Sequence, residues 1–120
     1  MTTHRDLSSI LDSYAASWGP ISRNERLAIF EQVLHEDFVY TDPNIQTTGH
    51  EQLADYMEGF QQQLPGGGFA NRDLAHHHDA LLMHWDMTGP DGTAISPGAS
   101  FGRVHPDGRL ASMTGFYEQQ

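Results

Sequence analysis

Apolar residues in the first half of the chain recur at the three- and four-residue spacing of helices. One such face lies within residues 6–18 and is made by Leu7, Ile10, Leu11, Tyr14, Ala15 and Trp18. Asp6 is placed to cap the start of this helix, and Gly19-Pro20 is placed to end it. The pattern therefore predicts a first helix over 6–18.

Two more helices are predicted before residue 65. Ser22 and Glu25 have the spacing of a capping box. The apolar positions of that second helix are Leu27, Ile29, Phe30, Val33 and Leu34. A third helix opens at 48–51, and its apolar stripe is Leu53, Ala54, Met57 and Phe60. A proline and three glycines at 65–68 end it.

The strand signals lie mainly in the second half. A short strand is predicted at 38–42, and Pro43 ends it because proline has no N–H for a strand ladder. After the glycine run the periodicity becomes two, and the predicted strands are 69–79, 80–88, 93–105 and 109–118. Turn residues at 89–92 and 106–108 predict hairpins.

The order of these elements predicts an α+β fold in a single domain spanning residues 1–120. Helices come first and antiparallel strands follow, so the helices are expected to cover one side of the sheet. A sheet of four or more strands would curl around them, because sheets twist.

Charge and composition narrow the classes of partner. The chain has six basic and sixteen acidic residues, a net charge of −10. Such a surface repels nucleic acid and anionic membranes, so neither is expected as a partner. There is no cysteine, and the N-terminal residues lack the pattern of a signal peptide, so a cytoplasmic protein is expected. No dinucleotide or phosphate-binding motif is present, and we expect no cofactor.

Asp42 is the first candidate for chemistry. Side chains alternate along a strand, so Phe38, Tyr40 and Asp42 share one face, and two aromatic residues on it indicate the interior. Phe38 and Tyr40 are therefore candidate ligand-binding residues. A carboxylate beside aromatic rings loses solvation and can serve as a general base. The alternative is a carboxylate that closes an Asx turn before Pro43.

Tyr14 is the second candidate, because it lies on the apolar helix face and offers a phenol to the interior. The alternative, which we favour, is a core tyrosine whose hydroxyl finds a local partner. The remaining apolar residues expected to line a pocket are also ordinary core candidates: Trp18, Tyr56, Phe60, Phe69, Trp85, Met113 and Tyr117.

Three consecutive histidines offer a further possibility. On a strand, His76 and His78 share a face and His77 takes the other, so the first two are candidate ligand-binding groups. They could act as acids or bases near neutral pH. No ligand set with metal-site spacing is present, so no metal is expected. A hydrogen-bonded polar strand face is the reading we favour.

An ordered set of short motifs resembles SnoaL-like proteins, the wider relatives of ketosteroid isomerase and nuclear transport factor 2. The set spans nearly the whole chain and comprises Tyr14, Trp18, the 37–43 segment, Gly49, Pro65-Gly66, Phe69, 77–79, Trp85, Asp91-Gly92, 101–103, 107–110 and Gly115-Phe116. The resemblance implies a cone-shaped fold of three helices on a curved, mainly antiparallel sheet. It also implies a homodimer formed through the outer face of the sheet.

The same resemblance suggests roles for site residues. In ketosteroid isomerase an aspartate is the base, and a tyrosine and a protonated aspartate stabilise the oxyanion. The matching positions here are Asp42, Tyr14 and Ser100, and serine is a weaker acid than the aspartate it replaces. The relation also implies that Met113 and Tyr117 face the pocket. At Ser100 this chain departs from the isomerase pattern, because serine stands where the isomerase has a protonated aspartate, and this argues against steroid isomerisation.

Two functional hypotheses follow from the sequence. In the first, the protein is a cofactor-independent acid–base enzyme, an isomerase, cyclase or dehydratase, acting on a small apolar carbonyl compound. In the second, it is a non-catalytic ligand-binding or dimerisation domain. An open cavity of several hundred Å³ lined by both Asp42 and Tyr14 would count against a filled, non-binding pocket.

Overall fold

The structure, a computed structural model, describes residues 6–117 of the chain. The start of the N-terminal segment and residue 118, the last of the final predicted strand, lie outside the described residues. The elements in chain order are α1 (Leu7–Ala16), α2 (Arg23–Val33), β1 (Leu34–Asp42), β2 (Ile45–Thr48), α3 (His50–Gln63), β3 (Gly68–His77), β4 (Ala80–Thr88), β5 (Ala94–Val104) and β6 (Leu110–Phe116).

The helix starts follow the predicted caps. The Asp6 carboxylate accepts a hydrogen bond from the N–H of Ser9 at the first turn of α1. At the start of α2 the Ser22 hydroxyl accepts from the N–H of Glu25, and the Glu25 carboxylate accepts from the N–H of Ser22. Both local signals are confirmed.

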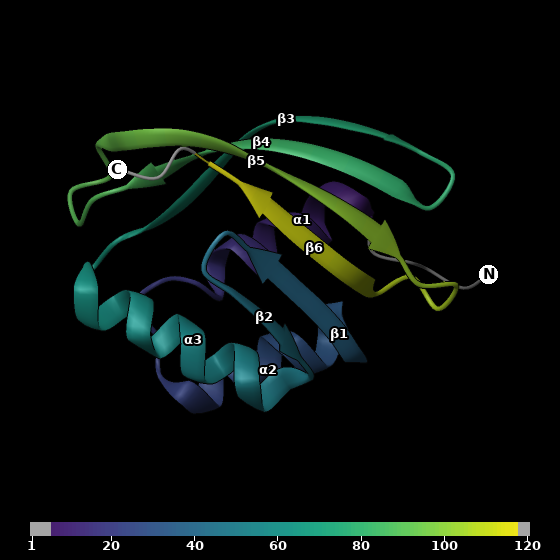
Figure 1. Ribbon diagram of the computed structural model, residues 1–120, viewed down its shortest axis with the longest axis horizontal. Coiled ribbons are helices and arrows are strands. Elements are labelled where there is room, and N and C mark those ends of the chain that lie inside the picture. Colours follow the sequence, from purple (N-terminus) through teal and green to yellow (C-terminus); the bar gives the residue numbers. More distant parts are fainter. Residues whose placement is uncertain (1–5, 118–120) are drawn as a thin grey trace.

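The strands form one sheet of six in the order β2-β1-β6-β5-β4-β3. Only the pair of β1 and β6 is parallel; every other neighbouring pair is antiparallel. The helices lie against the concave side of this sheet, and β3, β4 and β5 arch over them (Figure 1). The predicted α+β class, with three helices on a curved, mainly antiparallel sheet, is confirmed.

The region around Pro43 differs from the prediction. β1 begins at Leu34, directly after α2, rather than at residue 38. Pro43 and Asn44 form a two-residue turn, and the chain then returns as β2, with Ile45 opposite Asp42. The sequence did not indicate β2 because only Thr47 of its four residues is buried. Asp42 consequently lies at the end of a hairpin.

The core fills the space between the helices and the concave face. Strand β4 shows how the period of two is used: Leu81, Met83 and Trp85 are buried, whereas Leu82 is exposed on the outer face. Three further exposed apolar residues, Ile95, Phe101 and Phe116, lie on β5 and β6. Within residues 6–117 no helix is both long and apolar enough to cross a membrane.

Candidate functional site

A hollow of about 570 Å³ opens between the helices and the concave face of the sheet. Helices α1 and α3 and strands β1, β3, β4, β5 and β6 contribute side chains to its wall. The lining residues are Tyr14, Ala15, Trp18, Tyr40, Asp42, Asn44, Asp55, Tyr56, Gly59, Phe60, Gln63, Leu64, Phe69, Asn71, Met83, Trp85, Met87, Ser100, Met113, Gly115 and Tyr117. This wall is mainly aromatic, with a few polar groups.

The Asp42 carboxylate is held by four hydrogen bonds. Its Oδ2 accepts from the hydroxyls of Tyr40 at 2.8 Å and Tyr56 at 2.7 Å. Its Oδ1 accepts from the backbone N–H groups of Asn44 at 2.8 Å and Ile45 at 3.1 Å. The residue is 8% exposed and still borders the hollow. Asp42 therefore closes the predicted Asx turn with one oxygen and accepts from two phenols with the other.

The tyrosines around this carboxylate are held in the neutral form. Burial raises the pKa of Tyr14, Tyr40, Tyr56 and Tyr117, and the negative charge of Asp42 raises each of them further. These four are all the tyrosines of the chain. Neutral phenols can donate to Asp42, which an ionised tyrosinate could not do.

We expect the tyrosines of the folded protein to resist ionisation at alkaline pH. A raised pKa in the folded state stabilises the protein below the unfolded value of about 10, and this contribution is lost as the pH rises above it. At a pH of about 10.5, ultraviolet difference spectroscopy should show far less tyrosinate in the native protein than in guanidinium. Ordinary titration of all four phenols, with the circular dichroism spectrum unchanged, would contradict this arrangement.

Ser100 on β5 and Asp42 on β1 lie on either side of β6. The Ser100 Oγ accepts a hydrogen bond from the Trp85 indole N–H at 2.9 Å. Gly115, the cross-strand partner of Ser100, separates it from the end of β1. A Cβ placed on Gly115 would lie 3.7 Å from the Tyr40 hydroxyl and 3.8 Å from both the Asp42 Cβ and the Ser100 Oγ. The absence of a side chain at this strand position keeps the hollow open next to Asp42.

Most residues expected in the pocket border it. All three predicted catalytic candidates do so, including Tyr14, which is also a buried neighbour of Phe38. Eight of the eleven predicted ligand-binding residues also line the hollow: Trp18, Tyr40, Tyr56, Phe60, Phe69, Trp85, Met113 and Tyr117.

Three predicted ligand-binding residues lie elsewhere. Phe38 shares the inward face of β1 with Tyr40 and Asp42, but it is fully buried under Tyr14, with the ring centroids 6.0 Å apart. His76 and His78 are exposed at the far end of β3 and in the following turn. A shared strand face fixes the side to which a residue points but not how far along the strand the pocket extends.

Several lining residues carried no clear sequence signal. Asn44 follows Pro43, and its side-chain amide donates to the Tyr117 hydroxyl at 3.1 Å. Asn71 lies on β3 and donates to the Leu11 carbonyl at 3.2 Å. The one sequence feature that points to this part of the wall is Gly115, because a glycine within a strand often marks a place where another group approaches the backbone closely.

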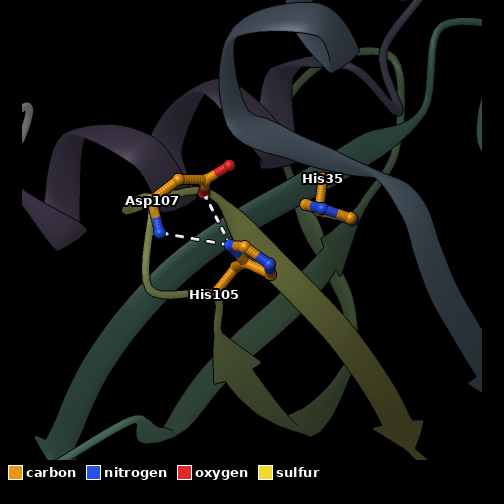
Figure 2. A group of neighbouring side chains, drawn as sticks. All are labelled: His35, His105 and Asp107. Atoms are coloured by element: carbon orange, nitrogen blue, oxygen red, sulfur yellow. Dashed lines mark hydrogen bonds and ion pairs between the residues drawn. The ribbon is translucent and has the colours of Figure 1, made fainter.

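A second cluster of polar side chains lies outside the hollow, where the turn before β6 meets the start of β1 (Figure 2). The rings of His35 and His105 stack with centroids 4.1 Å apart and planes 20° apart. Each Nδ1 atom accepts a backbone N–H, from Asp37 and Asp107 respectively. The Asp107 carboxylate accepts from the backbone N–H and from the guanidinium of Arg109, which lowers the pKa of Asp107 to about 2. These contacts brace the turn. One ligand atom from each of the three side chains lies within 4.8 Å of the others, but both Nδ1 atoms already accept backbone N–H groups.

Comparison with known proteins shows which family and which solved structures this chain is similar to. The sequence profile of the SnoaL-like domain matches residues 11–113. A protein from Agrobacterium tumefaciens, described as a candidate isomerase of the SnoaL-like family, is 25% identical, with a TM-score of 0.84 over 93% of this chain and 97% of that one. A candidate SnoaL-like polyketide cyclase from Jannaschia sp. gives 14% identity and a TM-score of 0.72 over 98% and 92% of the two chains.

A protein with a ketosteroid isomerase-like fold from Catenulispora acidiphila has the same architecture. It was solved in complex with trimethylamine and is 16% identical, with a TM-score of 0.73 over 97% of this chain and 88% of that one. No curated protein matches the sequence. At identities of 14% and 16%, the similarities to the Jannaschia and Catenulispora proteins establish the fold.

Proposed function

This chain belongs to the SnoaL-like domain family, and on that basis we propose that it binds a small, mostly apolar organic molecule in the hollow beside Asp42. The observation that carries the proposal is the open volume of about 570 Å³ next to a buried carboxylate. Pockets for small molecules commonly measure about 300–1,000 Å³ and combine an apolar wall with a few polar groups. The Catenulispora protein, which shares this fold, was solved in complex with trimethylamine, and this supports a small-molecule role.

The side chains of the wall indicate which kind of ligand would fit the hollow. Eight aromatic side chains and three methionines supply apolar contact, and the polar groups gather mainly at Asp42, Asn44 and Ser100. A ligand would therefore place its apolar body against Trp18 and Trp85 and direct its polar end towards these polar groups.

Intrinsic fluorescence can test this proposal, because the only two tryptophans of the chain, Trp18 and Trp85, line the hollow. We expect the neutral compound 4-tert-butylcyclohexanone to change the emission saturably. Gly115→Val places methyl groups where the probe approaches Asp42, and we expect it to weaken binding by about tenfold or more. Thr114→Val on the outer face of the same strand is the control. Equal binding by both variants would place the probe outside the hollow.

Acid–base turnover is a second candidate function, favoured by the hydroxyls of Tyr14 and Ser100 in the same hollow as Asp42. Asp42 would accept a proton from the carbon next to a carbonyl, and the two hydroxyls would donate to the oxygen that gains charge. Deuterium exchange at that carbon of 4-tert-butylcyclohexanone, followed by NMR, should slow by about a hundredfold or more in Asp42→Asn. An unchanged exchange rate would end this candidate.

We also propose a homodimer formed through the outer face of the sheet. Leu82 and Phe101 are cross-strand partners there, each 39% exposed, and Phe116 is 59% exposed. An apolar face of this kind is typical of an interaction surface. Sedimentation should show a dimer that Phe101→Asp dissociates; a monomeric wild-type protein at high concentration would contradict it.

A further inference from the structure

The charges that border the hollow are all negative. Among the residues that the structure describes, its wall contains the carboxylates of Asp42 and Asp55 and no arginine, lysine or histidine. Asp55 is well exposed at the edge and pairs with Arg23 at 2.9 Å. Asp42 is buried, and all four of its hydrogen-bond donors are uncharged groups. Of the two carboxylates in the wall, Asp42 is therefore the one without a cationic partner.

The arginines within residues 6–117 are engaged elsewhere. Arg23 pairs with three acidic residues on α3, and Arg26 donates to backbone carbonyls. Arg72, Arg103 and Arg109 pair with Asp86, Asp79 and Asp107 respectively. An ionised carboxylate in an apolar setting is costly without a counter-charge. The net charge of −10 adds a field that draws cations towards this opening.

Aromatic rings form a connected girdle around the hollow. The Trp18 ring lies within 5.3–6.0 Å of Tyr40, Tyr56, Phe60 and Phe69, measured between centroids. From Phe69 the contacts continue to Trp85 at 5.0 Å and from Trp85 to Tyr117 at 6.3 Å. The Tyr117 hydroxyl accepts from Asn44, whose own N–H donates to Asp42. The girdle thus begins and ends beside the unpaired carboxylate.

This combination is suited to one class of ligand. The faces of aromatic rings attract cations, most strongly where water is excluded, and indole rings are the best of them. The four acceptor positions of Asp42 are already occupied, so a primary ammonium would have to compete with the phenols and the backbone for them. A quaternary or tertiary alkylammonium spreads its charge over methyl groups and needs few or no hydrogen bonds.

We propose that the ligand of this hollow is an organic cation of the quaternary or tertiary alkylammonium class, held between the aromatic girdle and Asp42. The inference rests on the proposed small-molecule function and narrows its ligand. Binding neutralises the buried carboxylate without displacing the hydroxyls of Tyr40 and Tyr56. A neutral molecule of the same shape fills the same volume but gains neither the ring attraction nor the charge attraction.

The test compares choline with 3,3-dimethylbutan-1-ol, in which carbon replaces the quaternary nitrogen and the shape is retained. Binding to the full chain is followed by tryptophan fluorescence and calorimetry. We expect choline to bind about tenfold or more tightly than the alcohol. In Asp42→Asn this preference should fall to about threefold or less, whereas Asp79→Asn, which removes an exposed carboxylate outside the hollow, should keep it.

A ring variant provides an independent test. Phe60→Leu keeps an apolar side chain at a half-buried position and removes one ring face, so it should weaken choline binding more than alcohol binding. This variant decides the matter if Asp42→Asn fails to fold. Binding of the alcohol as tightly as choline overturns the cation inference and leaves the small-molecule function standing. Binding of neither compound, nor of 4-tert-butylcyclohexanone, overturns both.

Discussion

Gly98→Ala is expected to displace the Trp85 ring and abolish ligand binding in the hollow, with a loss of stability of about 2 kcal/mol. Gly98 on β5 lies opposite Trp85 on β4, and the indole covers the glycine. A Cβ at position 98 would lie 2.2 Å from a ring carbon of Trp85, well inside contact distance. The ring must move, and its hydrogen bond to Ser100 is then lost. The displaced indole would intrude on the hollow or leave its wall incomplete.

Urea unfolding and fluorescence titration with choline measure the two effects. Gly68→Ala is the matched control, because its Cβ would meet Thr88 at an ordinary 3.6 Å. We expect that control to change stability by less than about 0.5 kcal/mol and to keep binding. Wild-type choline affinity and stability in Gly98→Ala would show that the Trp85 ring is not part of the wall.

Arg26→Met is expected to destabilise the protein by about 3 kcal/mol. The residue is 1% exposed, and its guanidinium donates to the carbonyls of Ser17, Gly19 and Ile21 at 2.8, 2.9 and 3.3 Å. Methionine keeps the apolar stem but leaves these carbonyls without their donor. This turn carries Trp18, so the fluorescence of the folded variant should change as well.

Arg23→Met is the control for this effect. Arg23 precedes Arg26 by three residues on the same helix and pairs with Glu51, Asp55 and Glu58, but its side chain is 34% exposed. Exposed ion pairs contribute little, so we expect a loss below about 1 kcal/mol, measured by thermal unfolding. Equal losses in the two variants would mean that the buried hydrogen bonds of Arg26 contribute no more than the surface pairs.

The sequence predicted the fold well where local chemistry determines it. Capping at Asp6 and Ser22 and alternation along β4 depend on neighbouring residues, and both appear in the structure as expected. β2 was not predicted because its length and its polar residues give no strand signal, and it forms only because β1 is there to pair with it. Elements that depend on a partner distant in sequence cannot be inferred from their own pattern.

The same distinction applies to the site. The inward direction of Tyr40 and Asp42 followed from the period of two along β1. The depth of Phe38, the exposure of His76 and the phenol donated by Tyr56 depend on how far the helices cover the sheet. The missing cationic partner of Asp42 is likewise a property of the assembled wall, because Arg23 pairs with carboxylates of α3 and Arg26 donates to backbone carbonyls.

A crystal structure of the protein grown with choline tests the central claim most directly. We predict the trimethylammonium group within the aromatic girdle, against the rings of Trp18 and Trp85, with the Asp42 carboxylate as its nearest negative charge. Density for choline only on the outer face of the sheet, or a hollow closed by its own side chains, would contradict the account.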